Sequence, residues 1–369
     1  MDTKQIRTGI IGGSLNNQWA SKTHIPVLLQ SERHRITAIA TTNEASARKS
    51  AEVTGATLAA TDHRAVSGSS AVELVVVSVK VPDHYDAVRS AILAGQHVYC
   101  EWPLAVTTSE AEQLAGLARQ AGVHHAAGLQ ARQSPVLRQV KQRLERGEIG
   151  RILSCHMRVS TQGKGGVTDR QGAYLLSEKH GATLLAINGG HSLDALCYLL
   201  GDFRELSAMM NRNFSTATVL ATNEIIAKDT ADQIMVQGVL KSGASAFVHI
   251  QAGTYPAFEL EIQGELGVIR IVQHNSVGHV QFGNLEAHMA AYSSASRVAA
   301  SNPDHFVSVA KDAAEGEAVR QYVASAHEAF AKDIQTGTFT VPDFFEALHL
   351  HRLLDAIRLA AATGSRQTF

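Results

Sequence analysis

Short apolar runs alternate with amphipathic stretches over residues 1–125. The runs RTGIIGG, HRITAIAT, ELVVVSVK and HVYCEWP are separated by stretches such as NEASARKSAEVTG. This order is typical of βαβ units, and an unbroken run such as Val75, Val76 and Val77 fits a strand that helices cover on both faces. The pattern predicts an α/β fold with a doubly wound parallel sheet and a helix over 109–122.

From about residue 150 the apolar positions alternate strictly over longer segments. DQIMVQGVLKSGASAFVHIQAG, FELEIQGELGVIRIV and HVQFGN follow the run IGRILSCHMRVS. Such alternation suits an antiparallel sheet with one packed and one exposed face. We predict one domain over 1–150 and an α+β domain over 151–369 with a large open, mostly antiparallel sheet. Its last helix, over 343–363, is expected to pack back toward the first domain. The segment 285–315, rich in Ala, Ser and Asp, is expected to be a surface loop.

The composition supports two packed domains and narrows the class of partner. The chain has 369 residues, of which 45% are hydrophobic, and single cores stop growing at about 250–300 residues. Thirty-three basic and 34 acidic residues give a net charge of −1, so no overall field favours nucleic acid. No run approaches the roughly 20 apolar residues that span a bilayer, and the first residues lack a signal-peptide pattern. We expect a cytoplasmic protein whose partner is a small molecule or another protein.

A glycine turn follows the first predicted strand, in TGIIGGSLNNQWASKTHIP. It departs from the G-x-G-x-x-G pattern, since Gly12 is followed directly by Gly13 and then by Ser14. A glycine there still lets backbone N–H groups approach a pyrophosphate, whose charge is favoured at the start of the following helix. In its βαβ context the turn predicts a Rossmann dinucleotide site that includes Asn16 and Trp19. A tight turn without a ligand is the alternative.

The end of the second predicted strand bears on the choice of dinucleotide. It reads IATTN and has no carboxylate to hold the ribose 2′-hydroxyl of NAD. A 2′-phosphate is then not repelled, and Thr41, Thr42 and Arg48 offer hydrogen-bond donors to one. NAD and NADP both remain open.

His191 opens a predicted helix in NGGHSLDALCYLL. Asp194 stands three residues later on the same helical face, where a carboxylate can set the tautomer of a histidine. The two glycines that follow Asn188 permit close approach of a ligand. The pattern predicts an acid/base or ligand-binding histidine, with a structural or capping histidine as the alternative.

Several motifs together resemble the glucose-fructose oxidoreductase and inositol dehydrogenase (Gfo/Idh/MocA) family over nearly the whole chain. They are the glycine turn, His84 after a strand, EWP at 101–103, GLQARQSP and GGHSLD. The resemblance implies a Rossmann domain that binds NAD or NADP and a second domain that binds substrate. In this family a Glu-Lys-Pro lysine contacts the reacting sugar hydroxyl, and an Asp-x-x-x-His helix supplies an acid/base histidine.

The chain departs from the family pattern at catalytic positions. Trp102 stands where the lysine is expected and Ile187 where the aspartate is expected, whereas His191 is kept. The usual Thr-Pro-Asn is replaced by VKV at 79–81, and Lys80 is the one obvious candidate to replace the missing lysine.

Three separated segments are similar to the branch of the family that contains the galactose-pathway repressor of yeasts. They are WASKTH at 19–24, LQARQSP at 129–135 and ALHLHRL at 347–353. That branch also has Glu-Trp in place of Glu-Lys. The resemblance implies NAD or NADP binding and, for a regulatory member, a protein partner. Membership of the wider family implies assembly as a homodimer or homotetramer through the open sheet.

Two functions therefore remain open. The first is an NAD(P)-dependent oxidoreductase acting on a sugar or polyol-like substrate, with His191 as the surviving acid/base group and Trp102 as a wall for substrate or nicotinamide. The second is a non-catalytic regulator that responds to dinucleotide or sugar, which the loss of two catalytic positions favours. Redox-neutral sugar chemistry with a tightly held NAD is a minor third. As an alternative, Trp102 fills a former active site that no longer binds substrate.

The predicted site residues form three sets. Those predicted to be catalytic are His191, Glu101 and Trp102. Those predicted to bind substrate are Trp102, Arg132, Asn188 and His191. Those predicted to bind the cofactor are Gly12, Gly13, Ser14, Asn16, Trp19, Thr41, Thr42, Val79, His84, Glu101 and Gln130. No metal site is predicted, because the pairs His124 with His125 and His349 with His351 lack zinc-site spacing and further ligands. The glycine-containing segment 160–180 is a hypothetical lid.

Overall fold

The computed structural model describes residues 5–16, 18–274, 277–292, 305–313 and 316–369. The chain divides into two compact units. The amino-terminal unit comprises 1–130 with 319–352, and the carboxy-terminal unit comprises 131–318 with 353–369.

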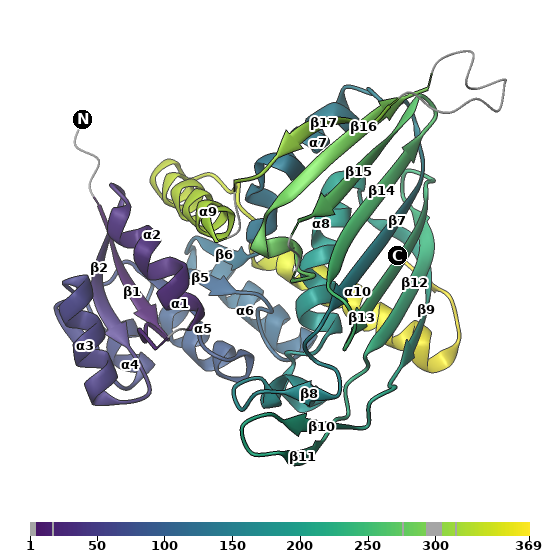
Figure 1. The fold of residues 1–369 in the computed structure, drawn as a ribbon. Coiled ribbons are helices and arrows are strands. Elements are labelled where there is room, and N and C mark those ends of the chain that lie inside the picture. The colour runs from purple at the N-terminus through teal and green to yellow at the C-terminus, as the bar shows by residue number, and fades with distance from the viewer. Residues whose placement is uncertain (1–4, 17, 275–276, 293–304, 314–315) are drawn as a thin grey trace. The chain divides into compact units, whose positions relative to one another are not determined.

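The amino-terminal unit is built on a six-stranded sheet in the order β3-β2-β1-β4-β5-β6, with parallel pairing throughout (Figure 1). Its strands are β1 (Ile6–Ile11), β2 (His34–Ala40), β3 (Leu58–Ala60), β4 (Leu74–Val77), β5 (His97–Glu101) and β6 (His125–Gly128). All four residues of β4 are buried, as expected for a strand covered on both faces. The predicted doubly wound sheet is confirmed.

Helices connect and cover these strands. They are α1 (Trp19–Lys22), α2 (His24–Gln30), α3 (Glu44–Thr54), α4 (His63–Ser67), α5 (His84–Leu93), α6 (Thr108–Ala121) and α9 (Glu317–Thr336). The sequence of α6 defines both its ends, since Thr107 and Glu110 form a capping box and Gly122 closes the helix with φ +64°. Phe330 of α9 packs into the same apolar core as Ile10 and Ile39.

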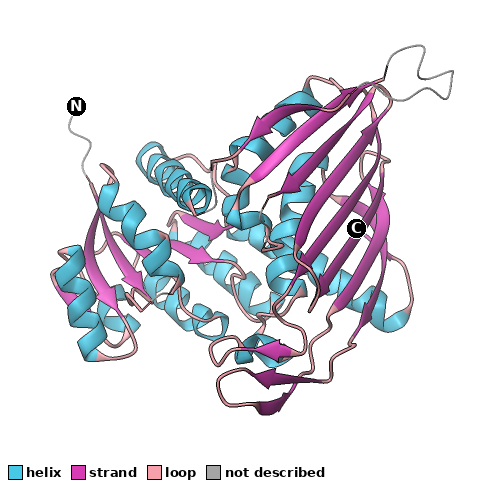
Figure 2. Ribbon diagram, in the orientation of Figure 1, coloured by secondary structure: helices cyan, strands magenta, loops and turns pink. Residues whose placement is uncertain are grey.

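The carboxy-terminal unit is built on a nine-stranded sheet, magenta in Figure 2, in the order β17-β16-β15-β14-β7-β13-β12-β9-β18. Its strands are β7 (Ile152–Thr161), β9 (Phe203–Asn211), β12 (Gln233–Leu240), β13 (Ser245–Ala252), β14 (Ala257–Gly264), β15 (Gly267–Gln273), β16 (Leu285–Ala291), β17 (Val307–Lys311) and β18 (Gln367–Thr368). All pairs are antiparallel except β7 with β13. The large, mostly antiparallel sheet is therefore as predicted.

The remaining elements of this unit are smaller. A three-stranded sheet joins β8 (Val167–Thr168), β10 (Thr216–Val219) and β11 (Glu224–Ala227). The helices are α7 (Pro135–Glu145) and α8 (Gly190–Leu200), and α7 contacts β16 and β17. Helix α10 (Phe344–Thr363) contributes to both units, because the division falls inside it. Within the part of the chain that the structure describes, no helix is both long and apolar enough to cross a membrane.

Two local predictions are wrong. HVQFGN forms a 3-10 turn, Val280–Phe282, and not a strand, since Gly278 (φ +70°) and Gly283 (φ +72°) break the extended chain on either side. The segment 285–315, predicted to be a loop, supplies β16 and β17. Pairing with β15 along its whole length outweighs the weak strand propensity of the alanines in β16. Residues 293–304 and 314–315 of that prediction lie outside the described residues.

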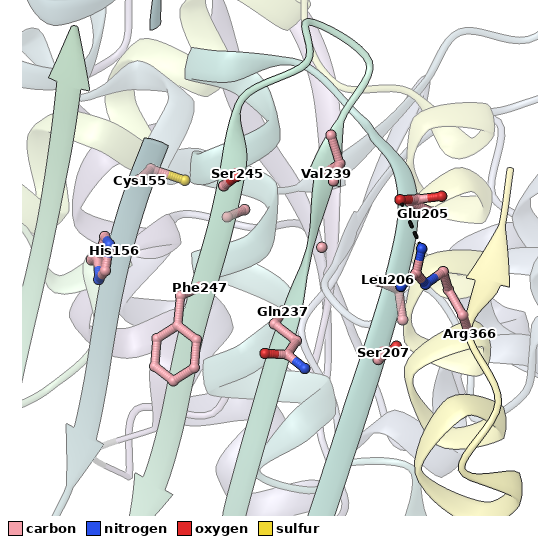
Figure 3. A pocket seen from close by; sticks show the side chains of 12 residues that line it. Cys155, His156, Glu205, Leu206, Ser207, Gln237, Val239, Ser245, Phe247 and Arg366 are labelled. Carbon is pink, nitrogen blue, oxygen red and sulfur yellow. Dashed lines mark hydrogen bonds and ion pairs between the residues drawn. The ribbon is translucent and has the colours of Figure 1, made fainter. Parts of the chain in front are cut away.

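One face of the nine-stranded sheet carries a shallow groove of about 410 Å³ (Figure 3). His156, Phe247, Gln237 and Ser207 form a row across β7, β13, β12 and β9, in register with one another. Arg366 pairs with Glu205 at 3.2 Å beside this row. The groove contains none of the predicted site residues.

Candidate functional site

A cavity of about 640 Å³ opens beside the carboxyl ends of β1 and β4 in the amino-terminal unit. The strand order reverses between these two strands, and doubly wound sheets bind their ligands at such a switch point. Six predicted cofactor residues line this cavity: Gly12, Ser14, Asn16, Thr41, Thr42 and Val79. The other five predicted cofactor residues, Gly13, Trp19, His84, Glu101 and Gln130, are not part of its lining.

Gly12 is required at the start of the turn. Its φ is +91°, and a Cβ there would lie 2.2 Å from the carbonyl oxygen of Ser78. The N–H groups of Gly12 and Gly13 both donate to Ala40 O, at 2.9 and 3.2 Å. These two N–H groups therefore fasten the end of β1 to the end of β2, and the approach of other backbone N–H groups of the turn to a pyrophosphate stays a prediction.

Ser14 is the better placed phosphate donor. Its Oγ accepts hydrogen bonds from Ser46 Oγ at 3.0 Å and from the N–H of Asn16 at 3.3 Å. A hydroxyl that accepts two bonds keeps its own hydrogen for donation. Ser14 lines the cavity, so its O–H can serve an anionic oxygen there.

The ribose end of the cavity has no carboxylate on β2, as the sequence predicts. Thr41 Oγ1 donates to Asn43 O at 2.9 Å, which leaves it only as an acceptor. Arg48 pairs with Glu44 at 2.5 Å on the surface of α3. Thr42, which is exposed, is the remaining predicted donor for a 2′-phosphate.

Glu101 and Gln130 contact each other in the amino-terminal unit. Glu101 is buried and accepts hydrogen bonds from His24 Nε2 at 3.0 Å and from Gln130 Nε2 at 3.4 Å. His24 Nδ1 in turn lies 2.8 Å from Nε2 of His327. Burial, followed by the charges of neighbouring histidines, lowers the pKa of His327 well below its usual range. Sequence reasoning missed both histidines, although His24 ends the WASKTH segment.

Trp102 is packed inside the amino-terminal unit. It is 4% exposed, and its ring centroid lies 4.8 Å from that of His351 on α10. The Trp102–Pro103 peptide bond is cis. His84 lies 2.7 Å from Pro103 O through Nδ1 and 3.1 Å from Val79 O through Nε2, so it links the turns that follow β5 and β4. Burial lowers the pKa of His84.

In the carboxy-terminal unit, Arg132 and Asp194 bind each other. Arg132 Nη2 donates to Asp194 Oδ1 at 2.7 Å, and Nε reaches both carboxylate oxygens at 3.1 Å. Burial raises the pKa of Asp194 and the Arg132 charge acts in the opposite direction. The prediction that Asp194 sets the tautomer of His191 is wrong, because the carboxylate is held by arginine. The guanidinium predicted to bind substrate is committed to this pair.

A second group of polar side chains forms what we term the lysine-histidine cluster: Lys164, Asn188, His191 and His279. A π-helix, Leu185–Gly189, leads into α8 and carries Asn188. Lys164 Nζ donates to Asn188 Oδ1 at 2.7 Å, and the ring centroids of His191 and His279 lie 5.0 Å apart. Of the four, sequence reasoning singled out Asn188 and His191 only.

The histidines of the cluster are buried with unsatisfied nitrogens. His191 is 2% and His279 6% exposed. Nδ1 of His191 and both ring nitrogens of His279 have no hydrogen-bond partner among the described residues. Each such nitrogen destabilises the unit by about 1–3 kcal/mol. Buried polar groups are nearly always hydrogen-bonded, so these nitrogens are available to an ordered water or to a polar ligand.

Burial and mutual repulsion set the charges of the cluster. Burial lowers the pKa of Lys164 from its usual 10.5 to about 7. Burial, followed by the Lys164 charge, lowers the pKa of His191 to about 3. His279 is shifted well below its usual pKa by burial and by the charges of His191 and Lys164. At neutral pH the two imidazoles are therefore neutral, and Lys164 is close to its titration midpoint.

One group of metal-ligand type side chains occurs within the described residues. His274, Glu286 and His288 place potential ligand atoms within 4.8 Å of one another. Glu286 already accepts from Ser308 Oγ and bonds to His274, both at 2.7 Å, and pairs with Lys311 at 3.5 Å. Protein partners thus satisfy this carboxylate, and the group carries no metal assignment.

Two family models match the chain. Residues 6–129 match the oxidoreductase family with an NAD-binding Rossmann fold. Residues 135–273 match the carboxy-terminal domain of Gal80p.

Curated relatives include both enzymes and regulators. Dehydrogenase aclE of Aspergillus oryzae is 30% identical over 289 residues, which cover 73% of this chain and 77% of that protein. The galactose/lactose metabolism regulatory protein GAL80 of Kluyveromyces lactis is 28% identical over 310 residues, which cover 77% of this chain. The match spans 66% of the length of that regulator.

Solved structures share the fold over the whole chain. A super-repressor mutant of Gal80p from Saccharomyces cerevisiae superposes with a TM-score of 0.86 at 21% identity, covering 99% of this chain and 98% of that one. Levoglucosan dehydrogenase in complex with NADH and levoglucosan superposes with a TM-score of 0.82 at 21% identity, covering 99% of both chains. Identity at this level shows a common fold.

Proposed function

Since this chain belongs to the Gfo/Idh/MocA family of NAD-binding oxidoreductases, we propose that it is an NAD- or NADP-dependent oxidoreductase acting on a hydroxyl group of a sugar or polyol-like substrate. The observation that carries the proposal is the cavity beside the switch point between β1 and β4. Gly12, which lines this cavity, has the φ of +91° that the tight turn after β1 requires.

The residues of the cavity fit a dinucleotide. Ser14 and Asn16 would meet the pyrophosphate, and Thr42 with Asn43 would meet the adenosine ribose at the end of β2. A bound dinucleotide would supply a hydride acceptor through its nicotinamide. These four side chains are uncharged and would bind phosphate oxygens through hydrogen bonds. Lys80 also lines the cavity and is its one lysine.

His191 is the family residue that would handle the substrate proton. It is buried and neutral at physiological pH, with Nδ1 unsatisfied among the described residues. A neutral imidazole can accept or donate a hydrogen bond at a substrate hydroxyl. Its low pKa makes it a weak base, so a second group has to take the proton efficiently.

The regulatory function is the second candidate, and the burial of Trp102 favours it. The residue at the family lysine position packs against His351, with the two rings tilted by 54°, and is 4% exposed. With Trp102 buried, this position cannot bind a substrate hydroxyl. A regulator that responds to sugar or NAD(P) without turnover does not need that contact. Its partner would then be another protein, as the yeast-repressor relatives suggest.

Titration calorimetry on cofactor-stripped protein with NAD⁺, NADH, NADP⁺ and NADPH tests the first step. A panel of D-xylose, D-galactose, levoglucosan and myo-inositol, followed by nicotinamide absorbance, tests the second. Binding with turnover supports the oxidoreductase, binding without turnover supports the regulator, and the absence of binding contradicts both.

We also propose a cytoplasmic homodimer or homotetramer that assembles through the open face of the nine-stranded sheet. The row from His156 to Ser207 includes Phe247, an exposed aromatic side chain that a partner sheet could cover (Figure 3). Sedimentation of the wild type and of Phe247→Glu tests the interface. A monomeric wild type would contradict it.

A further inference from the structure

We infer that the amino-terminal unit has a further binding site, for a neutral sugar or polyol, at the amino ends of β4 and β5. This site, which we term the amino-edge pocket, has a volume of about 340 Å³ and is lined by residues of the segments 67–73 and 94–97. The dinucleotide cavity opens at the opposite, carboxyl edge of the same sheet. The inference goes beyond the proposed function and uses residues of the amino-terminal unit alone.

The two segments that line the pocket are turns held by their own backbone hydrogen bonds. After α5, the N–H of Gln96 donates to Ala91 O at 3.0 Å across Gly95, whose φ is +74°. After α4, the N–H of Val72 donates to Ser69 O at 3.1 Å. A Cβ added to Gly95 would meet nothing within 4 Å, so the chain leaves open space at this turn. The walls of the pocket are therefore formed before any ligand binds.

Gln96 connects the two segments and contributes an unsatisfied acceptor. Its Nε2 donates to the carbonyl oxygens of Val72 at 3.1 Å and of Val66 and Ser69 at 3.4 Å each. These carbonyls fix the orientation of the amide, because only its nitrogen can donate to them. Oε1 then has no hydrogen-bond partner in the part of the chain that the structure describes, and Gln96 is 4% exposed. A ligand hydroxyl that donates to Oε1 would satisfy a buried group that proteins rarely leave unpaired.

His97 contributes an uncharged donor. Its Nδ1 accepts from the backbone N–H of His124 at 3.0 Å, so the hydrogen of the neutral ring is on Nε2. Burial, followed by the charge of His124, lowers the pKa of His97 to about 4, while the charge of Glu73 acts in the opposite direction. At neutral pH the ring is therefore neutral, and its Nε2–H is available to an oxygen of a ligand.

The donors and acceptors of the pocket select the class of ligand. Glu73 offers carboxylate oxygens, and its charge is paired with Arg7, whose N–H lies 3.0 Å and whose Nη2 lies 3.3 Å from it. Ser69 Oγ accepts from the N–H of Ala71 at 3.2 Å and keeps its own hydrogen for donation. A phosphate only accepts hydrogen bonds and an ammonium only donates them, whereas a hydroxyl does both. A lining with donors and acceptors side by side, and with its charge already paired, therefore fits a neutral molecule that carries several hydroxyls.

A first experiment locates binding and needs neither dinucleotide nor turnover. Amide hydrogen exchange of the full-length protein, read by mass spectrometry, is measured over concentration series of D-galactose, D-xylose and myo-inositol. At least one of them should slow exchange in both 67–73 and 94–97, because a ligand between the two turns restrains them together. Putrescine and inorganic phosphate are the charged comparison probes and should leave both segments unchanged.

A second experiment fills the pocket. Ala94 is exposed, lines the pocket and directly precedes Gly95, so Ala94→Phe places a ring in the open space. Ala121→Phe is the matched control, since Ala121 is also exposed and directly precedes a glycine at the end of a helix, α6. Ala94→Phe should abolish the protection by sugar and Ala121→Phe should keep it. Glu73→Gln should weaken the affinity about tenfold, as expected for the loss of one charged hydrogen-bond acceptor.

The outcomes separate this inference from the proposed function. Exchange in 67–73 and 94–97 that no sugar or polyol slows, or that only putrescine or phosphate slows, overturns the inference. Equal protection in Ala94→Phe and the wild type also overturns it. Ser70→Phe, at an exposed position on the opposite segment, is the second filling variant if Ala94→Phe does not fold. Affinity for NADH should be the same in every variant, because the dinucleotide cavity lies at the other edge of the sheet, so loss of NADH binding by the wild type contradicts the proposed function alone.

Discussion

Substitution of Gly12 by alanine is the most direct test of the dinucleotide cavity. The φ of +91° places alanine in a conformation that destabilises an L-residue by about 1–2 kcal/mol. In addition the new Cβ would lie 2.2 Å from Ser78 O, where ordinary contacts begin at 3.4 Å, so the backbone of β1 or β4 must move by about 1.2 Å (3.4 − 2.2). Such overpacking destabilises by about 1–3 kcal/mol more.

Two other glycines provide matched controls. Gly55 has φ +73°, and a Cβ added to it would meet nothing within 4 Å, so Gly55→Ala carries the conformational strain without the clash. In Gly13→Ala the new Cβ would lie 3.0 Å from side-chain atoms of Ile39, which can shift. Gly12→Ala should therefore lower the free energy of unfolding by about 2–5 kcal/mol, and Gly55→Ala by about 1–2 kcal/mol.

The displaced turn should also weaken dinucleotide binding. Ser78 N donates to Ile11 O at 2.9 Å, so a clash at Ser78 separates the two strand ends that frame the cavity. Urea denaturation and calorimetric titration with NADH measure both effects, and we expect at least a tenfold loss of affinity in Gly12→Ala, about 1.4 kcal/mol. Wild-type affinity in Gly12→Ala, together with the stability of Gly55→Ala, would refute the assignment of this turn to the cofactor.

Three further predictions concern buried and half-buried groups of the two units. Lys228→Met should lower the free energy of unfolding by about 3–5 kcal/mol, because it leaves the buried Asp232 without its cation; the exposed Lys241→Met should change it by less than about 1 kcal/mol, and equal urea midpoints would contradict this. Folding lowers the pKa of Lys164 from 10.5 to about 7. Between these two pH values the folded state binds fewer protons than the unfolded state, so the free energy of unfolding should rise with pH from about 7 to 10.5. Lys164→Met should remove this rise, and parallel curves of stability against pH for the wild type and the variant would show that the lysine is not buried in solution. Trp102→Lys, which restores the family residue, should destabilise the amino-terminal unit by about 3 kcal/mol or more without raising turnover, and a faster enzyme would show that the position still faces substrate.

The fold was largely predictable from local patterns. The apolar run Val75–Val77 predicts a strand covered on both faces, because such a strand needs no polar residue. The capping residues and the final glycine of α6 predict where that helix begins and ends. The family model and the sheet order confirm the predicted Rossmann fold and the NAD-binding family. β16 was missed because its stability comes from pairing with β15, which its alanine-rich sequence does not reveal. The domain limits at 1–150 and 151–369 stay a prediction.

The candidate site was predictable only where a motif was contiguous. Gly12 and Ser14 stand directly after a predicted strand, so their place at the cavity follows from the chain order. The contacts of the lysine-histidine cluster are long-range: Asn188 and Gly278 lie 90 residues apart. No local signal connects Lys164 with His279, although each stands beside glycines that hint at close packing. The predicted catalytic and binding roles themselves remain proposals.

Burial determines whether a lysine can carry its charge at two positions of this chain, 102 and 164. A family site needs a lysine near the substrate hydroxyl, and position 102 cannot supply one without placing an ammonium against His351 in a packed interior. In the carboxy-terminal unit, burial lowers the pKa of Lys164 to about 7, and the two glycines that follow it have no room for a side chain. The pH dependence of unfolding in the wild type and in Lys164→Met therefore measures how far Lys164 is desolvated in the folded carboxy-terminal unit.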